Sequence, residues 1–159
     1  MSSIDEILAG YENLRPGQED FYRDLHQHPE LSHQEHQTAR CVAGRRRGDG
    51  FTVHEGIGGT GVAGVLANGS GPTVLLRCEL DALPLRETTG APFASTVTVK
   101  GAHGQEVSVD HACGHDMHMA CEGDLPTNHS PAFLPPLQPT PRTGTEALVA
   151  GALAWLAPH

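Results

Sequence analysis

The sequence predicts an α/β fold, and three observations support this. Capping-box patterns and apolar residues at helical spacing occupy most of the first 47 residues. From Phe51 onward, the apolar residues follow the shorter period of β-strands. Two carboxylates, Glu79 and Asp81, come directly after an apolar strand, where sites usually lie on open α/β sheets. With 159 residues, the chain is long enough for one domain with a real core.

The helices are predicted from capping signals at their starts and from helix-breaking residues at their ends. Phe21 and Leu25 share one helical face, and Pro29 ends that helix. The expected helices are a short one opened by the capping box Ser3–Glu6, one from about Gly17 to His28, and one opened by the capping box Ser32–Glu35 that runs to about Arg47.

The strands are predicted from short apolar runs between turn residues. Gly58–Gly61 is a turn, and no Lys-Ser/Thr pair follows it, so it is not a phosphate-binding loop. Asn68–Gly71 is a hairpin turn. The expected strands are Phe51–His54, Val62–Ala67, a buried strand Thr73–Arg77, and a weaker pair around Val97–Lys100 and Val107–Val109.

The character of the chain changes after Cys121. Seven of the 12 prolines lie beyond it, and residues 122–144 have neither helical nor strand period, so we expect disorder there. Thr145–Leu156 is apolar enough for a short helix. We therefore divide the chain into a domain over residues 1–121 and a Pro-rich tail over residues 122–159.

Composition excludes several classes of partner. The formal net charge of -9 argues against nucleic acid, and Arg45–Arg47 is expected to be a solvated helix end. No signal peptide is recognised at the N-terminus, and the longest apolar run, Ala147–Pro158, is too short to span a bilayer. We expect a cytoplasmic protein without a membrane partner, whose four cysteines form no disulfides.

The densest cluster of potential metal ligands is the stretch His111–His118. Within it, Cys113 and His115 are the strongest candidate ligands, because a thiolate and a neutral imidazole both bind zinc-like ions. Gly114 between them allows the backbone to bend so that both can face one ion. Asp116 is expected to orient a ligand. His111 and His118 are open between ligand, supporting donor and surface residue, and a merely His-rich turn is an equal alternative for the whole stretch.

Two other clusters have weaker cases. Glu79 and Asp81 would share one face of a strand, where they could bind a metal or orient an imidazole. A solvated strand end is the alternative. No pattern of carboxylates accompanies the N-terminal histidines, which we expect at the surface: His26, His28, His33 and His36.

Four motifs, in order, make the chain resemble a known group of enzymes. They are Arg23–Ser32 (RDLHQHPELS), Gly56–Val62 (GIGGTGV), Leu76–Leu85 (LRCELDALPL) and His111–His118 (HACGHDMH). The order and spacing resemble the metal-dependent amidohydrolases and peptidases that include hippurate hydrolase, N-acyl amino acid amidohydrolases and indoleacetyl-amino acid hydrolases, relatives of aminoacylase and glutamate carboxypeptidase. The resemblance covers about residues 18–121.

The resemblance implies an α/β/α catalytic domain with a mixed sheet and two divalent ions, zinc or manganese. It makes Cys113 and His115 metal ligands and Asp81 a carboxylate that orients a ligand, with Glu79 beside it in place of the usual Asp. The implied activity is hydrolysis of amide bonds in N-acyl amino acids or small peptide-like conjugates. A small-molecule substrate is therefore the expected partner.

The resemblance also implies that the domain is incomplete. After Cys121 the family continues with a Leu- and Ala-rich helix, a Glu-Glu pair, two later His ligands and a lid domain, and residues 122–159 match none of these. We expect an N-terminal part with a frameshifted or decayed tail and with weak activity or none. The alternative is a non-catalytic metal-binding or interaction module that keeps half of the metal site.

Overall fold

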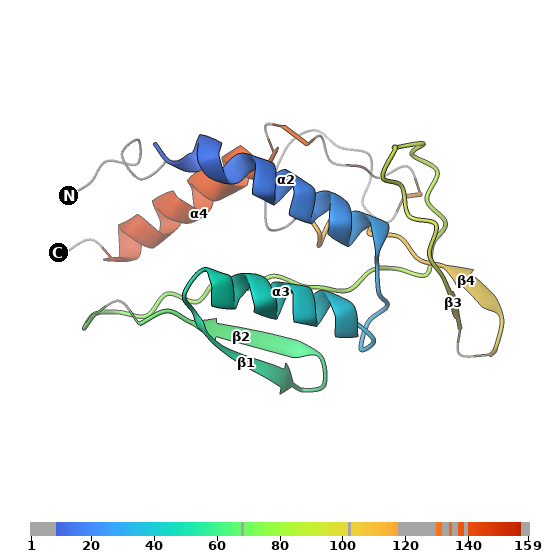
Figure 1. Cartoon of the computed structure of the whole chain (residues 1–159), viewed down its shortest axis with the longest axis horizontal. Helices are drawn as coiled ribbons and strands as arrows, with labels where there is room; N and C mark the ends of the chain where they lie inside the picture. Colours follow the sequence, from blue (N-terminus) through green and yellow to red (C-terminus); the bar gives the residue numbers. More distant parts are fainter. Residues whose placement is uncertain are drawn as a thin grey trace.

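A computed structural model describes residues 9–67, 69–101, 103–117, 130–131, 134, 137–138 and 140–156 (Figure 1). These residues form an α/β arrangement, so the predicted fold class is confirmed. Its elements are α2 (Tyr11–Gln27), α3 (His36–Gly48), β1 (Thr52–Ile57), β2 (Gly61–Val65), β3 (Thr98–Lys100), β4 (Glu106–Ser108) and α4 (Thr140–Leu156).

Helix α2 begins six residues before the predicted start, at Tyr11 instead of Gly17. Pro16 lies inside this helix, and because proline normally breaks a helix, the sequence pattern favoured a later start. Burial favours the longer helix, since Tyr11 at its start is only 4% exposed. The capping box Ser3–Glu6 lies outside the described residues.

Helix α3 is capped differently from the prediction. Its N-cap is Glu35, whose side chain makes no capping hydrogen bond to the helix and instead accepts from the backbone N–H of His33 at 2.9 Å. The carboxylate of Glu30 takes the capping role, accepting from the N–H groups of Gln37 at 3.0 Å and Thr38 at 2.7 Å. A carboxylate at this position stabilises both the free N–H groups and the helix dipole.

The arginines at the end of α3 are packed against aromatic rings. The guanidinium of Arg45 lies 4.7 Å from the ring centre of Phe21, and that of Arg46 lies 5.6 Å from the ring centre of Phe51. Arg45 also donates to the backbone carbonyl of Gly17 at 3.1 Å. The expectation of a merely solvated helix end was therefore wrong here, because arginine covers apolar surface with its planar head group.

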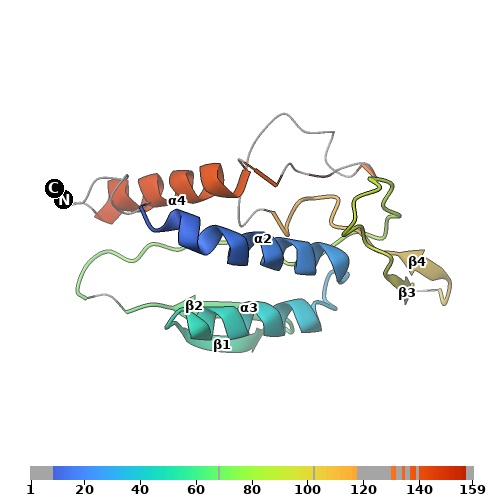
Figure 2. The same cartoon turned by 45° about the horizontal axis from the view of Figure 1, so that its top comes forward.

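Strands β1 and β2 form an antiparallel hairpin that packs against α3 (Figures 1 and 2). Residues 58–60 make the turn, as predicted. Gly61 is required after it, because a Cβ there would lie 2.4 Å from the carbonyl oxygen of Ile57. Thr60 in the turn donates a hydrogen bond from its hydroxyl to Glu35 at 2.6 Å, which fixes the hairpin to the start of α3.

The predicted buried strand Thr73–Arg77 is not a strand. Residues 73–77 have no strand assignment, and Leu75 and Leu76 are 88% and 60% exposed. A strand buried on both faces needs neighbours on both edges, and in the described part of the chain β1 pairs only with β2. The apolar side chains of this segment are therefore exposed to solvent in the structure.

The segments that carry the later motifs are joined by short β contacts. The pair β3 and β4 is antiparallel, which confirms the weaker predicted strand pair. Ala82 pairs with Leu31 in a parallel bridge, and Leu83 pairs with Asp110 in an antiparallel bridge. The described residues thus hold two antiparallel hairpins and bridges of both senses. The bridges bring together the connection between α2 and α3, the segment after Asp81 and the stretch from Asp110.

Helix α4 confirms the predicted apolar helix but begins at Thr140 instead of Thr145. The prediction of disorder was therefore wrong for residues 140–144, where Pro141 occupies the first turn, the place in a helix that tolerates proline. Residues 122–129 lie outside the described residues. α4 lies against α2 in both views, and Arg142 reaches Glu12 of α2 at 3.7 Å (Figures 1 and 2).

The largest buried side chains gather between α2 and the stretch that follows β4. Tyr22 and Met117 form the centre of this core, with Phe93 and Leu137 packed against them. The fully buried Ala43 lies in α3, which faces the β1–β2 hairpin. None of the helices in the described part of the chain has the length and apolar character needed to cross a membrane.

Candidate metal centre

The stretch from Asp110 to Met117 is a compact double turn. Gly114 donates its N–H to the carbonyl of His111 at 3.0 Å, and Met117 donates its N–H to the carbonyl of Gly114 at 2.9 Å. Gly114 has a φ of 72°, a conformation in which a side chain would be strained. The predicted bend at Gly114 is confirmed, and it lies between buried Cys113 and half-buried His115.

His115 lies between the two carboxylates that the sequence singled out. Its Nδ1 is 2.9 Å from both the backbone oxygen and the Oδ1 of Asp81, and its Nε2 is 3.1 Å from the Oε2 of Glu79. The donor atoms of these three residues lie within 4.8 Å of one another. Two regions 34 residues apart in sequence, 79–81 and 115, therefore meet in one cluster.

Two acceptors at Nδ1 favour one tautomer of the neutral His115 ring. When Asp81 accepts the Nδ1 proton, the lone pair of the neutral ring is on Nε2, which is directed to Glu79. This is how metal-binding imidazoles are usually oriented. Glu79 is also held by Arg77, whose guanidinium is 2.6 Å from its Oε1.

Cys113 lies beside this cluster but is not one of its three members. Burial raises the pKa of the Cys113 thiol, and the negative charges of Asp81, Glu79 and Asp116 raise it further. The thiol therefore lies within electrostatic range of the same group of carboxylates. Cys113 is free, as are Cys41 and Cys78, so the expectation of no disulfide holds for these three, while Cys121 lies outside the described residues.

Asp116 does not orient His115. Its Oδ2 is 2.7 Å from Nδ1 of His26, and its Oδ1 accepts from the N–H of Met117 at 2.9 Å. Both the Asp116 and the His26 side chains are almost fully buried, at 1% and 0% exposed. The surface placement predicted for His26 was therefore wrong, because Asp116, distant in sequence, supplies a buried partner.

Among the described residues, no other histidine of the predicted clusters belongs to the Glu79–Asp81–His115 cluster. His111 is 1% exposed, and neither of its ring nitrogens has a hydrogen-bond partner among the described residues. Burial lowers the pKa of His111, which favours a neutral ring. His28, His33 and His36 are exposed, as predicted, and His118 lies outside the described residues.

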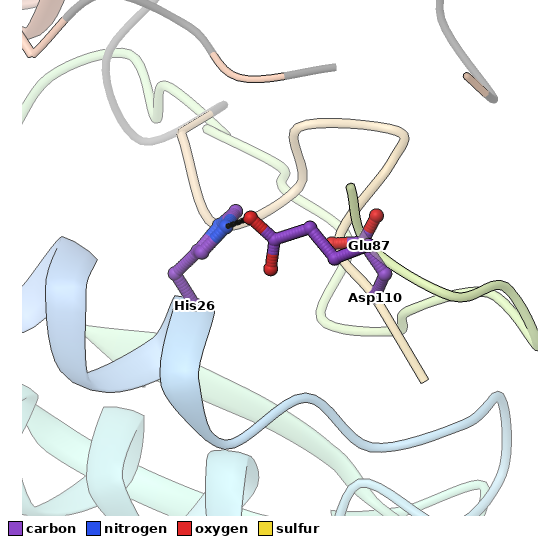
Figure 3. A group of neighbouring side chains, drawn as sticks. All are labelled: His26, Glu87 and Asp110. Carbon is purple, nitrogen blue, oxygen red and sulfur yellow. Dashed lines mark hydrogen bonds and ion pairs between the residues drawn. The ribbon is translucent and has the colours of Figure 1, made fainter. Parts of the chain in front are cut away.

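A second buried cluster was missed by sequence reasoning. The donor atoms of His26, Glu87 and Asp110 lie within 4.8 Å of one another (Figure 3). Neither Glu87 nor Asp110 belongs to a recognisable sequence motif. Glu87 is a single carboxylate in a loop, and Asp110 is a single carboxylate just after a strand. The tertiary contact between α2 and these two segments creates the cluster.

Known proteins resemble this chain in both sequence and structure. Hippurate hydrolase of Campylobacter jejuni is 40% identical over 119 residues, which are 74% of this chain and 28% of that protein. The YXEP protein of Bacillus subtilis, described as a dinuclear metal-binding peptidase of the M20 family, matches with a TM-score of 0.57 and 33% identity over 67% of this chain. The chain is homologous to the M20 amidohydrolases.

The M20 relationship covers a limited part of the relatives. Thermostable carboxypeptidase 2 of Saccharolobus solfataricus is 45% identical over 100 residues, 62% of this chain and 23% of that protein. The chain thus spans about a quarter of the length of the curated M20 relatives that it matches. No family model matches the chain.

The residues of this chain fit the divalent ions of the M20 proteins. Imidazole nitrogen, carboxylate oxygen and thiolate sulfur are the donors that zinc-like ions take in proteins. Glu79, Asp81 and His115 already bring three such donors together, and a cation there would counteract the negative charges that raise the pKa of Cys113. The donor chemistry and the charge both favour a divalent cation at this point.

Proposed function

We propose that this chain takes part in the metal-dependent hydrolysis of amide bonds in N-acyl amino acids or small peptide-like conjugates. The observation that carries this proposal is the Glu79–Asp81–His115 cluster beside buried Cys113, in a chain homologous to M20 amidohydrolases. We further propose zinc or manganese as the ion and the cytoplasm as the location.

Each residue of the site has a proposed role. Cys113 and His115 are ligands, and Asp81 orients His115 by holding the proton on Nδ1, so that Nε2 can bind. Glu79, 3.1 Å from Nε2, is the further carboxylate available to an ion. A bound divalent ion would supply Lewis acidity, which polarises an amide carbonyl and makes water more acidic.

A groove next to the site offers room for a small substrate. It has a volume of about 500 Å³, and its lining includes Glu79 and Asp81, Thr60 of the β-turn, and Glu35 and Val42 of the α3 region. Binding sites for small molecules commonly have volumes of this order. An N-acyl amino acid placed here would present its amide bond to the two carboxylates at the edge of the groove.

The alternative function is a non-catalytic metal-binding module. The segment that carries Glu79 favours this alternative, because it belongs to no strand and the Glu79 side chain is 46% exposed. Catalytic groups are normally held in place to fractions of an ångström by packed surroundings. A site with one half-exposed carboxylate outside any strand would still bind a metal but would position substrate less rigidly.

Hydrolysis assays with defined metal content separate the two functions. The full chain is freed of metal with a chelator, reloaded with zinc or manganese, and incubated with N-acetyl- and N-benzoyl-amino acids. We expect metal-dependent release of the amino acid, at a low rate, that is lost in Cys113→Ser and in His115→Ala and kept in Cys41→Ser, whose half-buried thiol lies on α3 outside the groove. Stoichiometric metal without any hydrolysis would instead establish the non-catalytic module.

A further inference from the structure

The second buried cluster joins three separate parts of the fold. His26 lies near the end of α2, Glu87 lies in the loop after the Leu83 bridge, and Asp110 follows β4. Figure 3 shows the three side chains directed toward one another. The side chains of His26 and Glu87 are 0% and 1% exposed, and Asp110 is 0% exposed. The cluster is therefore separated from solvent, unlike Glu79 in the first cluster.

The hydrogen bonds of His26 direct one nitrogen to the other two residues. Nδ1 is 2.7 Å from Oδ2 of Asp116, which is itself fixed through Oδ1 by the N–H of Met117. A proton on Nδ1 leaves the lone pair of a neutral ring on Nε2, which lies 3.3 Å from Oε1 of Glu87. A carboxylate behind one nitrogen and acceptors in front of the other is the usual arrangement around a metal-binding histidine.

Glu87 is held rigidly in place. Its Oε1 also accepts from the hydroxyl of Thr89, and its Oε2 accepts from the backbone N–H of Ser95 at 2.5 Å. These bonds orient the carboxylate toward His26 without neutralising its charge. A preformed carboxylate of this kind loses little further freedom on binding a cation.

Asp110 supplies the observation that points to a missing ligand. Both of its carboxylate oxygens are buried, and neither has a hydrogen-bond partner within the part of the chain that the structure describes. Its backbone is fixed by two hydrogen bonds with Leu83, at 2.9 and 3.0 Å, which hold the base of the side chain beside the cluster. A buried carboxylate without a partner is costly, and buried charges are normally paired or bind metals.

The charges of the cluster do not balance within the described residues. Glu87, Asp110 and Asp116 surround one imidazole, so an imidazolium would leave two negative charges without compensation. Burial raises the pKa of Asp110 to about 6, and the charge of Glu87 adds to the effect. Protonation of His26 would satisfy Asp116 and Glu87 but would leave the oxygens of Asp110 unpartnered.

We propose that Nε2 of His26 and the carboxylates of Glu87 and Asp110 bind a divalent transition-metal ion of the zinc type. This buried site is distinct from the cluster of Glu79, Asp81 and His115. The 3.3 Å between Nε2 and Oε1 of Glu87 is close to the donor–donor distance of about 3.3–3.4 Å that zinc bonds of about 2.0–2.1 Å give in a tetrahedron. The ion joins α2 to the loop at Glu87 and to the segment after β4, so its role is structural.

The test uses zinc ions and three variants of the full chain. Asp110→Asn keeps the shape of the side chain and removes no hydrogen bond to another described residue, so it is expected to fold. The double variant Cys113→Ser/His115→Ala dismantles the other candidate site. Asp20→Asn, which alters a carboxylate that is 78% exposed, is the control for loss of one negative charge.

Zinc binding is measured by competition with a chromophoric chelator, and metal content is measured after dialysis. We expect the double variant and Asp20→Asn to retain the buried ion, and Asp110→Asn to bind one equivalent less than the unaltered chain. Saturation at zinc 100-fold above its dissociation constant is expected to raise Tm by about 5–10 °C in the double variant and not in Asp110→Asn. Cobalt in the double variant is expected to show metal absorption without a thiolate charge-transfer band.

Two results would overturn the proposal. The first is equal zinc stoichiometry and equal Tm shifts in Asp110→Asn and in Asp20→Asn. The second is a double variant that binds no zinc and whose His26 remains an imidazolium, by ¹⁵N NMR, in the presence of excess zinc. In that second case a proton, and not a metal, occupies the cluster. Neither readout depends on hydrolysis, so failure of the proposed function leaves this test intact.

Discussion

Replacing Asp116 by Asn tests whether this residue stabilises the fold through His26. Asn has the same shape, but only one of its two terminal atoms accepts hydrogen bonds. In the native structure Oδ2 faces Nδ1 of His26 at 2.7 Å, and Oδ1 accepts from the N–H of Met117 at 2.9 Å. Whichever way the amide is turned, its NH₂ group faces one of these two donors, so one buried hydrogen bond is lost.

The expected cost follows from that loss. A buried donor left without a partner costs about 1–3 kcal/mol, and the bond to His26 also loses its charge. We therefore expect Asp116→Asn to lower the free energy of unfolding by about 1.5–3 kcal/mol and Tm by about 3–12 °C. Urea unfolding in the presence of a chelator measures this, with Asp20→Asn as the exposed control, expected within about 0.5 kcal/mol of the unaltered chain. A cost below about 0.5 kcal/mol for Asp116→Asn would refute the reasoning.

Three further predictions concern stability. Glu30→Gln weakens the cap of α3 by removing the charge that faces two helix N–H groups, so we expect a loss of about 0.5–2 kcal/mol in urea unfolding, while Glu12→Gln on the exposed side of α2 changes little. Met117→Ala empties part of the main core and should cost about 2–5 kcal/mol, and a smaller loss would show that the core collapses around the cavity. Burial alone would raise the pKa of Glu35. Hydrogen bonds to its carboxylate, of which the bond from Thr60 has the largest effect, outweigh burial and lower the pKa below its usual value of 4.5. The carboxylate therefore stabilises the fold above that value, and the advantage of the unaltered chain over Glu35→Gln should be full near neutral pH and shrink as the pH falls below the folded pKa. A difference that stays constant from pH 7 to pH 3 would contradict this.

Local signals predicted the elements that depend on local residues. The glycine-rich turn, the weak strand pair, the apolar C-terminal helix and the bend at Gly114 follow from short-range preferences and are all present. The segment 73–77 failed because burial of a strand depends on neighbouring strands, which apolar residues alone cannot supply. Helix α2 extends past Pro16 for a similar reason, since its buried tyrosines outweigh one lost hydrogen bond.

The candidate site was predicted in part. The two motifs that contain Asp81 and His115 do meet, and the pairing of Ala82 with Leu31 and of Leu83 with Asp110 shows how the backbone brings them together. The partners of Asp116 and of His26 were not predictable from spacing, because they are 90 residues apart. Glu87 and Asp110 lay outside every motif. They become candidate metal ligands only because the fold buries their carboxylates together without a compensating positive charge among the described residues.

The most direct test of the first metal site is the absorption spectrum of the cobalt-loaded chain. The Cys113 thiol lies within electrostatic range of the carboxylates of the cluster, and its coordination would produce a thiolate charge-transfer band. We predict that this band is present in the unaltered chain, absent in Cys113→Ser, and retained in Asp110→Asn. Bound cobalt without the band, or a band that persists in Cys113→Ser, would contradict the assignment of Cys113 as a metal ligand.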